Sequence, residues 1–120
     1  MSDDRHPMKP EITLVFDADC PNVRAVRAAL REALEHAGLD PGWIEYDRAA
    51  PGVPERFLGF GSPTILVDGE DVADEPAVVA AASCRVYQAA GGLRGVPPVE
   101  AIVAAINRRR GAAPGTREIR

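Results

Sequence analysis

The chain has 120 residues, of which 46% are hydrophobic and 27% are charged, and its formal net charge is −4. This balance is typical of one globular domain that is large enough to fold without disulfide bonds. The basic residues are almost all arginines and are scattered along the chain. The clustered positive charge of a nucleic-acid binder is missing, so we expect no nucleic-acid partner.

The first ten residues, MSDDRHPMKP, are polar and contain no apolar stretch, so we expect no secretory signal peptide. No run approaches the roughly 18 apolar residues that a membrane-spanning helix requires, so we expect no membrane partner. These features favour the cytoplasm, where cysteines are more often catalytic, sensing or metal-binding than structural. The chain has two cysteines, Cys20 and Cys84.

The first two elements follow directly from hydrophobic patterning. Residues 11–17 (EITLVFD) form a nearly continuous apolar run, which predicts a strand buried on both faces. The next apolar residues recur at helical spacing, and they are Val23, Val26, Leu30 and Leu34. We therefore predict a helix over 21–37, with Pro21 in its first turn and Gly38 just past its end.

The middle of the chain predicts two further strands. Residues 43–47 (WIEYD) carry aromatic and β-branched side chains, and residues 64–67 (TILV) form an apolar run closed by the turn dipeptide Asp68-Gly69. Between these two strands, prolines and glycines leave room only for a short helix near 54–58.

The last third of the chain predicts one more strand and one more helix. Residues 84–88 (CRVYQ) indicate a strand, and the segment before it predicts a helical turn around 77–82. An apolar stripe beginning after Pro97-Pro98 predicts a final helix that ends at Gly111. The segments 1–10 and 111–120 are expected to be disordered.

The elements over 11–110 therefore occur in the order strand, helix, strand, short helix, strand, strand, helix. This order predicts a single α/β domain with a mixed four-stranded sheet and helices on both faces. The strand at 84–88 is expected to be the fourth strand of that sheet.

Three stretches carry a resemblance to a known family. They are FDADCPN (16–22), GSPTILVDG (61–69) and SCRVY (83–87). With the predicted element order, they resemble the thioredoxin-like fold family in its glutaredoxin-like branch. The chain looks most like small bacterial proteins with an FDxCPN…SPTxxVDG…SCRxY pattern, some of which are labelled alkylmercury-lyase-like. The resemblance covers about residues 11–107 and implies a thioredoxin-like three-layer α/β/α fold.

The resemblance also implies which residues form a site. In thioredoxin-fold proteins a cis-proline lies against a nucleophilic cysteine, so a cis Ser62–Pro63 bond is expected beside Cys20. Substrate contacts are then expected from Pro21, Asn22, Ser62 and Pro63. The backbone of Ser62 would pair with an extended peptide or with glutathione in the manner of a β-strand.

The position of Cys20 favours a reactive thiol. At the start of a helix, unpaired backbone N–H groups and the helix dipole favour the thiolate. The negative charges of Asp17 and Asp19 oppose ionisation. Val23 stands where a Cys-x-x-Cys motif has its second cysteine, so only monothiol chemistry is open to this motif. The alternative is a partly buried structural cysteine, because free cysteine is often buried and inert.

Cys84 is a second candidate thiol, and the predicted topology places its strand far from Cys20. It either pairs functionally with Cys20 or is a core or edge residue. We expect no cofactor, although the resemblance leaves glutathione open as a ligand, since Gly91 and Gly92 precede the last helix as a glycine pair does in glutaredoxins. Arg94 either supplies a positive charge to it or is a solvated loop arginine. No Asp or Ser caps that helix, however, and no Lys precedes Cys20.

The leading functional hypothesis is monothiol thiol–disulfide exchange through Cys20, with a thiol or disulfide protein or a small-molecule thiol as partner. A second hypothesis is a noncatalytic module that binds a peptide along the edge at Ser62. A third is the handling of a soft metal or an organomercurial by Cys20 and Cys84. His6 and His36 lack a third ligand at suitable spacing, so no zinc-type site is expected. The sequence does not predict an oligomeric state.

Overall fold

The computed structural model describes residues 9–73, 78–80, 84–89 and 92–111. Its elements are β1 (Ile12–Phe16), α1 (Val23–His36), β2 (Ile44–Asp47), the 3₁₀-helix η2 (Glu55–Phe57), β3 (Thr64–Val67), β4 (Glu70–Asp71), β5 (Val78–Ala80), β6 (Cys84–Ala89), β7 (Gly92–Arg94) and α2 (Val99–Gly111). The predicted strands that became β1, β2, β3 and β6 are confirmed, as are the two long helices and the short one between β2 and β3.

The main sheet has four strands in the order β2-β1-β3-β4. Strand β1 pairs with β2 in parallel, whereas β3 is antiparallel to both β1 and β4. The parallel pair is connected through α1, as a parallel crossover requires. The predicted α/β class with a mixed four-stranded sheet is therefore confirmed.

The identity of the fourth strand corrects the sequence prediction. Asp68 and Gly69 have φ values of 52° and 86°, so both central residues adopt the left-handed region that a tight two-residue hairpin turn requires. The turn sends the chain straight back, and Val67 pairs with Glu70. The fourth position in the sheet is thus taken by the two-residue strand β4, and the predicted strand at 84–88 lies elsewhere.

That predicted strand, β6, lies at the centre of a second sheet with the order β5-β6-β7. Both of its pairings are antiparallel. The helical turn predicted around 77–82 is wrong for Val78–Ala80, which form β5 and pair with Val86, Arg85 and Cys84. Two adjacent β-branched residues, Val78 and Val79, favour this extended conformation. Residues 77, 81 and 82 lie outside the described part.

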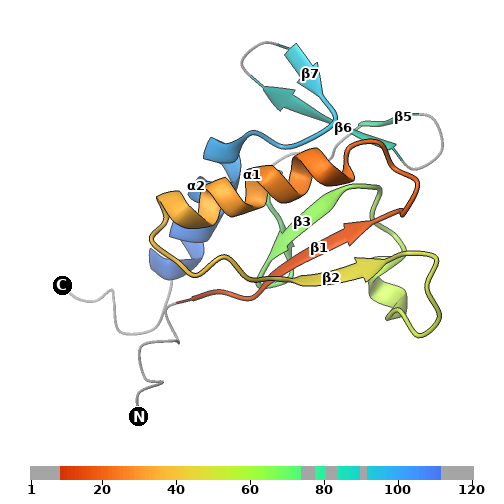
Figure 1. Cartoon of the computed structure of the whole chain (residues 1–120), viewed down its shortest axis with the longest axis horizontal. Helices are drawn as coiled ribbons and strands as arrows, with labels where there is room; N and C mark the ends of the chain where they lie inside the picture. The colour runs from red at the N-terminus through yellow and green to blue at the C-terminus, as the bar shows by residue number, and fades with distance from the viewer. Residues whose placement is uncertain (1–8, 74–77, 81–83, 90–91, 112–120) are drawn as a thin grey trace.

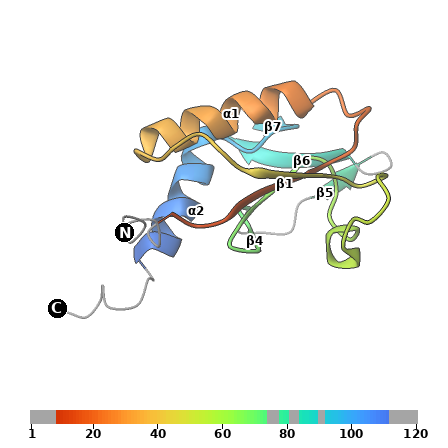
Figure 2. The ribbon, with the colours of Figure 1, turned by 60° about the horizontal axis from the view of Figure 1, so that its bottom comes forward.

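The core has two parts because alternate residues of β1 and β3 point to opposite faces of the main sheet. On one face both helices pack on the strands, and the fully buried members of this cluster include Leu14, Val26, Leu30, Leu34, Ile65, Ile102 and Ile106. On the other face η2 contributes Phe57, which packs with Val15 and Leu66. Figure 1 shows α1 lying across the sheet, and Figure 2 shows α1 and the yellow-green η2 on opposite sides of it. The sequence predicts helices on both faces of the sheet. In the described part of the chain, α1 and α2 both lie on one face, and the short helix η2 lies on the other.

A surface ion pair joins α1 to β2. Arg27 Nη2 and Nε donate to the two carboxylate oxygens of Glu45 at 2.8 and 2.9 Å, and Trp43 Nε1 donates to Glu45 Oε2 at 2.9 Å. The hydrogen bond from Arg27 lowers the pKa of Glu45, and the same bond raises the pKa of Arg27. Both side chains are partly exposed, so this pair contributes little to stability.

Most of the two chain ends expected to be disordered, residues 1–8 and 112–120, lies outside the described part. Within it, Pro10 is buried, and Lys9 Nζ donates to the carbonyl of Asp40 at 3.2 Å. Gly111 is the last residue of α2. Neither α1 nor α2, the two long helices in the described ranges, has the length and apolar character that crossing a bilayer would demand.

Candidate functional site

The turn between β1 and α1 holds Cys20. The Cys20 amide donates to the carbonyl of Asp17 at 2.9 Å, and the Cys20 carbonyl accepts from the amide of Val23 at 3.4 Å. The first helical hydrogen bond runs from Val26 N to Asn22 O, so α1 begins at Val23 with Asn22 as its N-cap. The prediction that Pro21 lies in the first helical turn is therefore wrong by two residues. Cys20 lies outside that turn, where the effect of the helix dipole is weaker.

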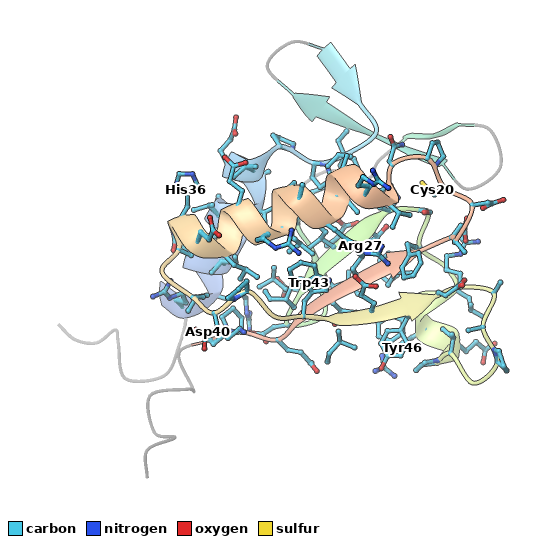
Figure 3. The ribbon with its side chains drawn as sticks, viewed as in Figure 1. Cys20, Arg27, His36, Asp40, Trp43 and Tyr46 are labelled. Atoms are coloured by element: carbon cyan, nitrogen blue, oxygen red, sulfur yellow. The ribbon has the colours of Figure 1, made fainter. Side chains whose placement is uncertain are left out.

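The exposure of Cys20 helps to distinguish a reactive thiol from a structural cysteine. The residue is only 9% exposed. Figure 3 shows it in the chain segment that leads into α1. Pro21, the next residue, is exposed, and Asn22 is half-buried. Cys20 is thus covered except for a small part of its surface, next to a proline that solvent reaches freely.

Ser62 and Pro63 lie next to this turn. The amide of Asp17 donates to Ser62 Oγ at 2.9 Å, which links the Cys20 turn to the segment that opens β3. The Ser62–Pro63 peptide bond is cis, as the resemblance predicted. Both residues are almost completely buried. The structure therefore brings Ser62 and the Cys20 turn together but leaves little of Ser62 or Pro63 exposed.

Arg48 is a neighbour of this turn that the sequence analysis did not single out. Its Nε lies 3.4 Å from Asp17 Oδ1, without the geometry of a hydrogen bond, and its Nη1 donates to the carbonyl of Phe60 at 2.8 Å. Neither Asp17 nor Asp19 caps α1, because the helix has no side-chain cap. Instead, Asp17 faces a cation that offsets the negative charge near Cys20.

Tyr87 is a second residue without a predicted role. It lies in β6, is only 4% exposed, and its hydroxyl donates to the carbonyl of Pro63. This hydrogen bond joins the second sheet to the Ser62–Pro63 segment. The residue is part of the SCRVY stretch that carried the resemblance, but nothing in the sequence pattern indicated which carbonyl it would reach.

Asn22, one of the predicted substrate contacts, packs against a glycine. A Cβ added to Gly95 would lie 2.2 Å from Asn22 Nδ2 and 2.7 Å from Asn22 Cγ. Only glycine permits so close an approach. The segment that leads from β7 into α2 therefore packs against the N-terminus of α1, and the Asn22 side chain is partly occupied by this contact.

The remaining predicted residues lie partly outside the described part. Cys84 begins β6 and its backbone pairs with Ala80, but its side chain is not described, so both alternatives for it, a functional pairing with Cys20 and a core or edge residue, stay open. Gly92 and Arg94 bound β7, and Gly91 is not described. Where side chains are described, no three His, Cys, Asp or Glu residues come together as a metal site.

Together the fold and these contacts define a mixed α/β protein with one largely covered thiol in the turn between β1 and α1. Comparisons with protein-family models, curated proteins and solved structures find no match to this chain. The functional argument therefore rests on the chain's own residues.

Proposed function

We propose that the chain is a thioredoxin-like protein that carries out monothiol thiol–disulfide exchange through Cys20. The observation that carries this proposal is a pair of hydrogen bonds, from Cys20 N to Asp17 O and from Asp17 N to Ser62 Oγ. Through them, the thiol-bearing turn and the cis Ser62–Pro63 segment form one structural unit. The element order from β1 to β3 and the final helix α2 also support the assignment.

The proposed exchange has two steps. The Cys20 thiolate attacks one sulfur of a disulfide, so a new sulfur–sulfur bond forms to Cys20 and the second sulfur leaves as a thiolate. The thiolate of an external small-molecule thiol then attacks the mixed disulfide and releases Cys20. Each step breaks one disulfide and forms one. No second cysteine is needed, consistent with Val23 at the resolving position.

The neighbours of Cys20 have distinct roles in this proposal. Arg48 offsets the charge of Asp17, so the incoming disulfide and the thiolate meet less negative charge. Pro21, the exposed neighbour of Cys20 in the chain, is expected to be the first residue that a substrate contacts. Ser62 already takes part in an isolated β-bridge, so one side of its backbone at most remains for an extended substrate. The chemistry suits a reducing compartment such as the cytoplasm.

A deglutathionylation assay tests the proposal. A glutathionylated peptide is incubated with excess glutathione and catalytic amounts of protein, and release of the free peptide is followed. Wild type and Cys84→Ser are expected to accelerate release over the protein-free reaction, whereas Cys20→Ser is not. Acceleration that survives Cys20→Ser, or that is absent from the folded wild type, contradicts the proposal.

The burial of this region favours one alternative, a noncatalytic binding module. Cys20, Ser62 and Pro63 are all largely covered, which hinders attack on a bulky disulfide. In this case the thiol is structural, and the partner is a peptide held along the backbone near Ser62. A folded Cys20→Ala variant that keeps the biological phenotype of the wild type would favour this module, whereas loss of the phenotype would favour exchange chemistry.

A further inference from the structure

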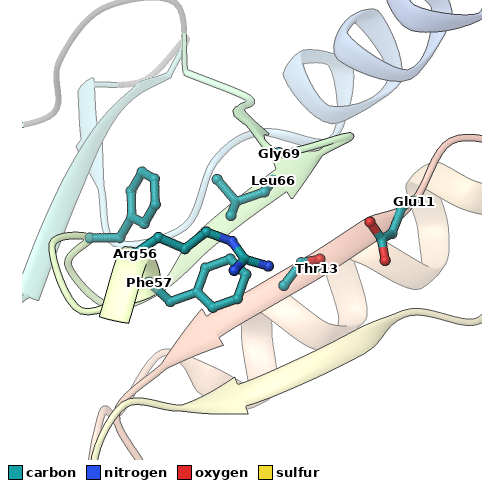
Figure 4. Close-up of a pocket in the computed structure, with 7 residues that line it drawn as sticks. Glu11, Thr13, Arg56, Phe57, Leu66 and Gly69 are labelled. Carbon is teal, nitrogen blue, oxygen red and sulfur yellow. The ribbon is translucent and has the colours of Figure 1, made fainter. Parts of the chain in front are cut away.

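A pocket opens on the face of the main sheet that the two helices leave uncovered. Its volume is about 260 Å³. The pocket is lined by Thr13 of β1 and by Glu11 just before that strand, by Leu66 of β3, and by Arg56 and Phe57 of η2 (Figure 4). Typical pockets for drug-sized ligands measure about 300–1,000 Å³, so this one suits a smaller molecule. It lies on the face of the sheet opposite α1.

Thr13 supplies a polar group without a partner. The residue is only 6% exposed, and within the described part of the chain its hydroxyl makes no hydrogen bond. The Thr13 oxygen is nevertheless not among the side-chain atoms sealed from solvent, so a molecule that enters the pocket can reach it. Thr13 lines the pocket, and Figure 4 shows its oxygen between the side chains of Arg56 and Glu11. A ligand in the pocket would replace water as the hydrogen-bond partner of this hydroxyl.

Two opposite charges also line the pocket without meeting. Glu11 and Arg56 are both exposed, and among the described residues neither side chain has an ion-pair partner. The guanidinium of Arg56 lies over the ring of Phe57, 4.5 Å from its centroid. A cation–π contact of this kind involves no hydrogen bond, so the guanidinium N–H groups remain able to donate to a carboxylate. The pocket thus offers a donor for an anion and an acceptor for a cation.

The apolar part of the pocket lies between these polar groups. Phe57 and Leu66 are buried, and Phe60, which also lines the pocket, packs on the same cluster. An apolar group resting on them would leave water, which favours binding.

We propose that this pocket binds a small zwitterion with an apolar body, of the chemical class of the apolar α-amino acids. The carboxylate accepts hydrogen bonds from Arg56 and from the Thr13 hydroxyl, and the ammonium lies against Glu11. The apolar side chain packs on Phe57 and Leu66. This site does not depend on Cys20 or on the proposed exchange reaction.

The test uses three related probes in titrations followed by amide chemical shifts. L-Leucine carries both charges, N-acetyl-L-leucine lacks the ammonium, and L-leucinamide lacks the carboxylate. We expect saturable shifts at the pocket residues with L-leucine, and at least tenfold weaker binding of both derivatives. Equal binding of all three probes, or no binding of L-leucine, would overturn the proposal.

Variants separate the pocket from nonspecific charge effects. Thr13→Val keeps the shape of the side chain and removes the hydroxyl, and we expect it to weaken L-leucine binding about tenfold. Arg56→Gln is expected to weaken it at least as much, whereas the control Arg24→Gln, exposed on α1, leaves it unchanged. Should Thr13→Val fail to fold, the exposed pair Arg56→Gln and Glu11→Gln carries the test. Binding that is unaffected in these variants refutes the site. Binding that survives Cys20→Ser confirms its independence from the thiol.

Discussion

The hydrogen bond from Tyr87 to Pro63 predicts a stability change that can be worked out in advance. Tyr87→Phe keeps the buried ring and removes only the hydroxyl, so no cavity forms. The carbonyl of Pro63 then loses a buried partner. A lost hydrogen bond that leaves one group unpaired costs about 1–3 kcal/mol. For a domain of this size, each kcal/mol lowers the melting temperature by about 4–8 °C.

Equilibrium urea unfolding gives the assay, since a loss of stability lowers the midpoint while the slope stays unchanged. Tyr46→Phe is the matched control. Tyr46 is half-buried, its ring stacks on Phe57 with centroids 4.6 Å apart, and among the described residues its hydroxyl has no hydrogen-bond partner. The control should stay within about 0.5 kcal/mol of wild type. If the two variants lose the same free energy of unfolding, the Tyr87 hydroxyl does not hold the second sheet to the Ser62–Pro63 segment.

Three further predictions concern packing and charge. Leu30→Ala removes a fully buried side chain and should lower the free energy of unfolding by about 2–5 kcal/mol, whereas Leu58→Ala, at a residue 45% exposed, should change it by less than about 0.5 kcal/mol; similar losses for both would contradict the assigned core. Gly95→Ala should lower the free energy of unfolding by about 1–3 kcal/mol, because the added Cβ clashes with Asn22. The double variant with Asn22→Ala should regain most of that free energy. If the effects of the two substitutions simply add, the contact is not the cause. Because the folded-state pKa of Glu45 is lowered, its contribution is complete above its unfolded pKa and is lost as the pH falls through the folded pKa. The free energy of unfolding should therefore fall less between about pH 7 and about pH 3 in Glu45→Gln than in the wild type. The expected difference is about 0.2–1 kcal/mol, because the pair is partly exposed. The same pH profile in both proteins would contradict this prediction.

The elements that hydrophobic periodicity defines could be predicted from the sequence. The strand at 64–67 and the helix from 23 to 36 have strong apolar patterns, and both lie where the patterns indicated. The cis Ser62–Pro63 bond was also foreseen, through the resemblance alone. The hydrophobic patterns could be interpreted without knowing the fold, because each depends only on residues that are close together in the chain.

The errors arose where pairing between distant residues decides the structure. The dipeptide Asp68-Gly69 predicts a turn, but the sequence does not show that it forms a hairpin, because the partner strand β4 has only two residues. Alanine-rich residues near 80 favoured a helical turn, and pairing with β6 overrode that preference. The sequence did not indicate roles for Arg48 and Tyr87 for the same reason. Their partners, Asp17 and Pro63, are distant from them in the chain.

The site was predicted in part. Cys20 and Ser62 were named, and the structure links their segments through Asp17. The sequence left open whether Cys20 is reactive or partly buried and gave no sign that Ser62 is buried, because burial depends on what the rest of the chain packs against these residues. The pocket on the second face corresponds to no sequence motif, since Thr13 and Arg56 line the same pocket only after η2 folds over the sheet.

The most direct test of the central claim compares the Cys20 thiol in the folded and unfolded chain. The Cys84→Ser variant is exposed to a small glutathione mixed disulfide, and formation of the Cys20 mixed disulfide is timed by mass spectrometry with and without urea. A working exchange site predicts faster reaction in the folded protein than in the unfolded chain. Slower reaction in the folded protein, as burial alone would cause, would contradict the account.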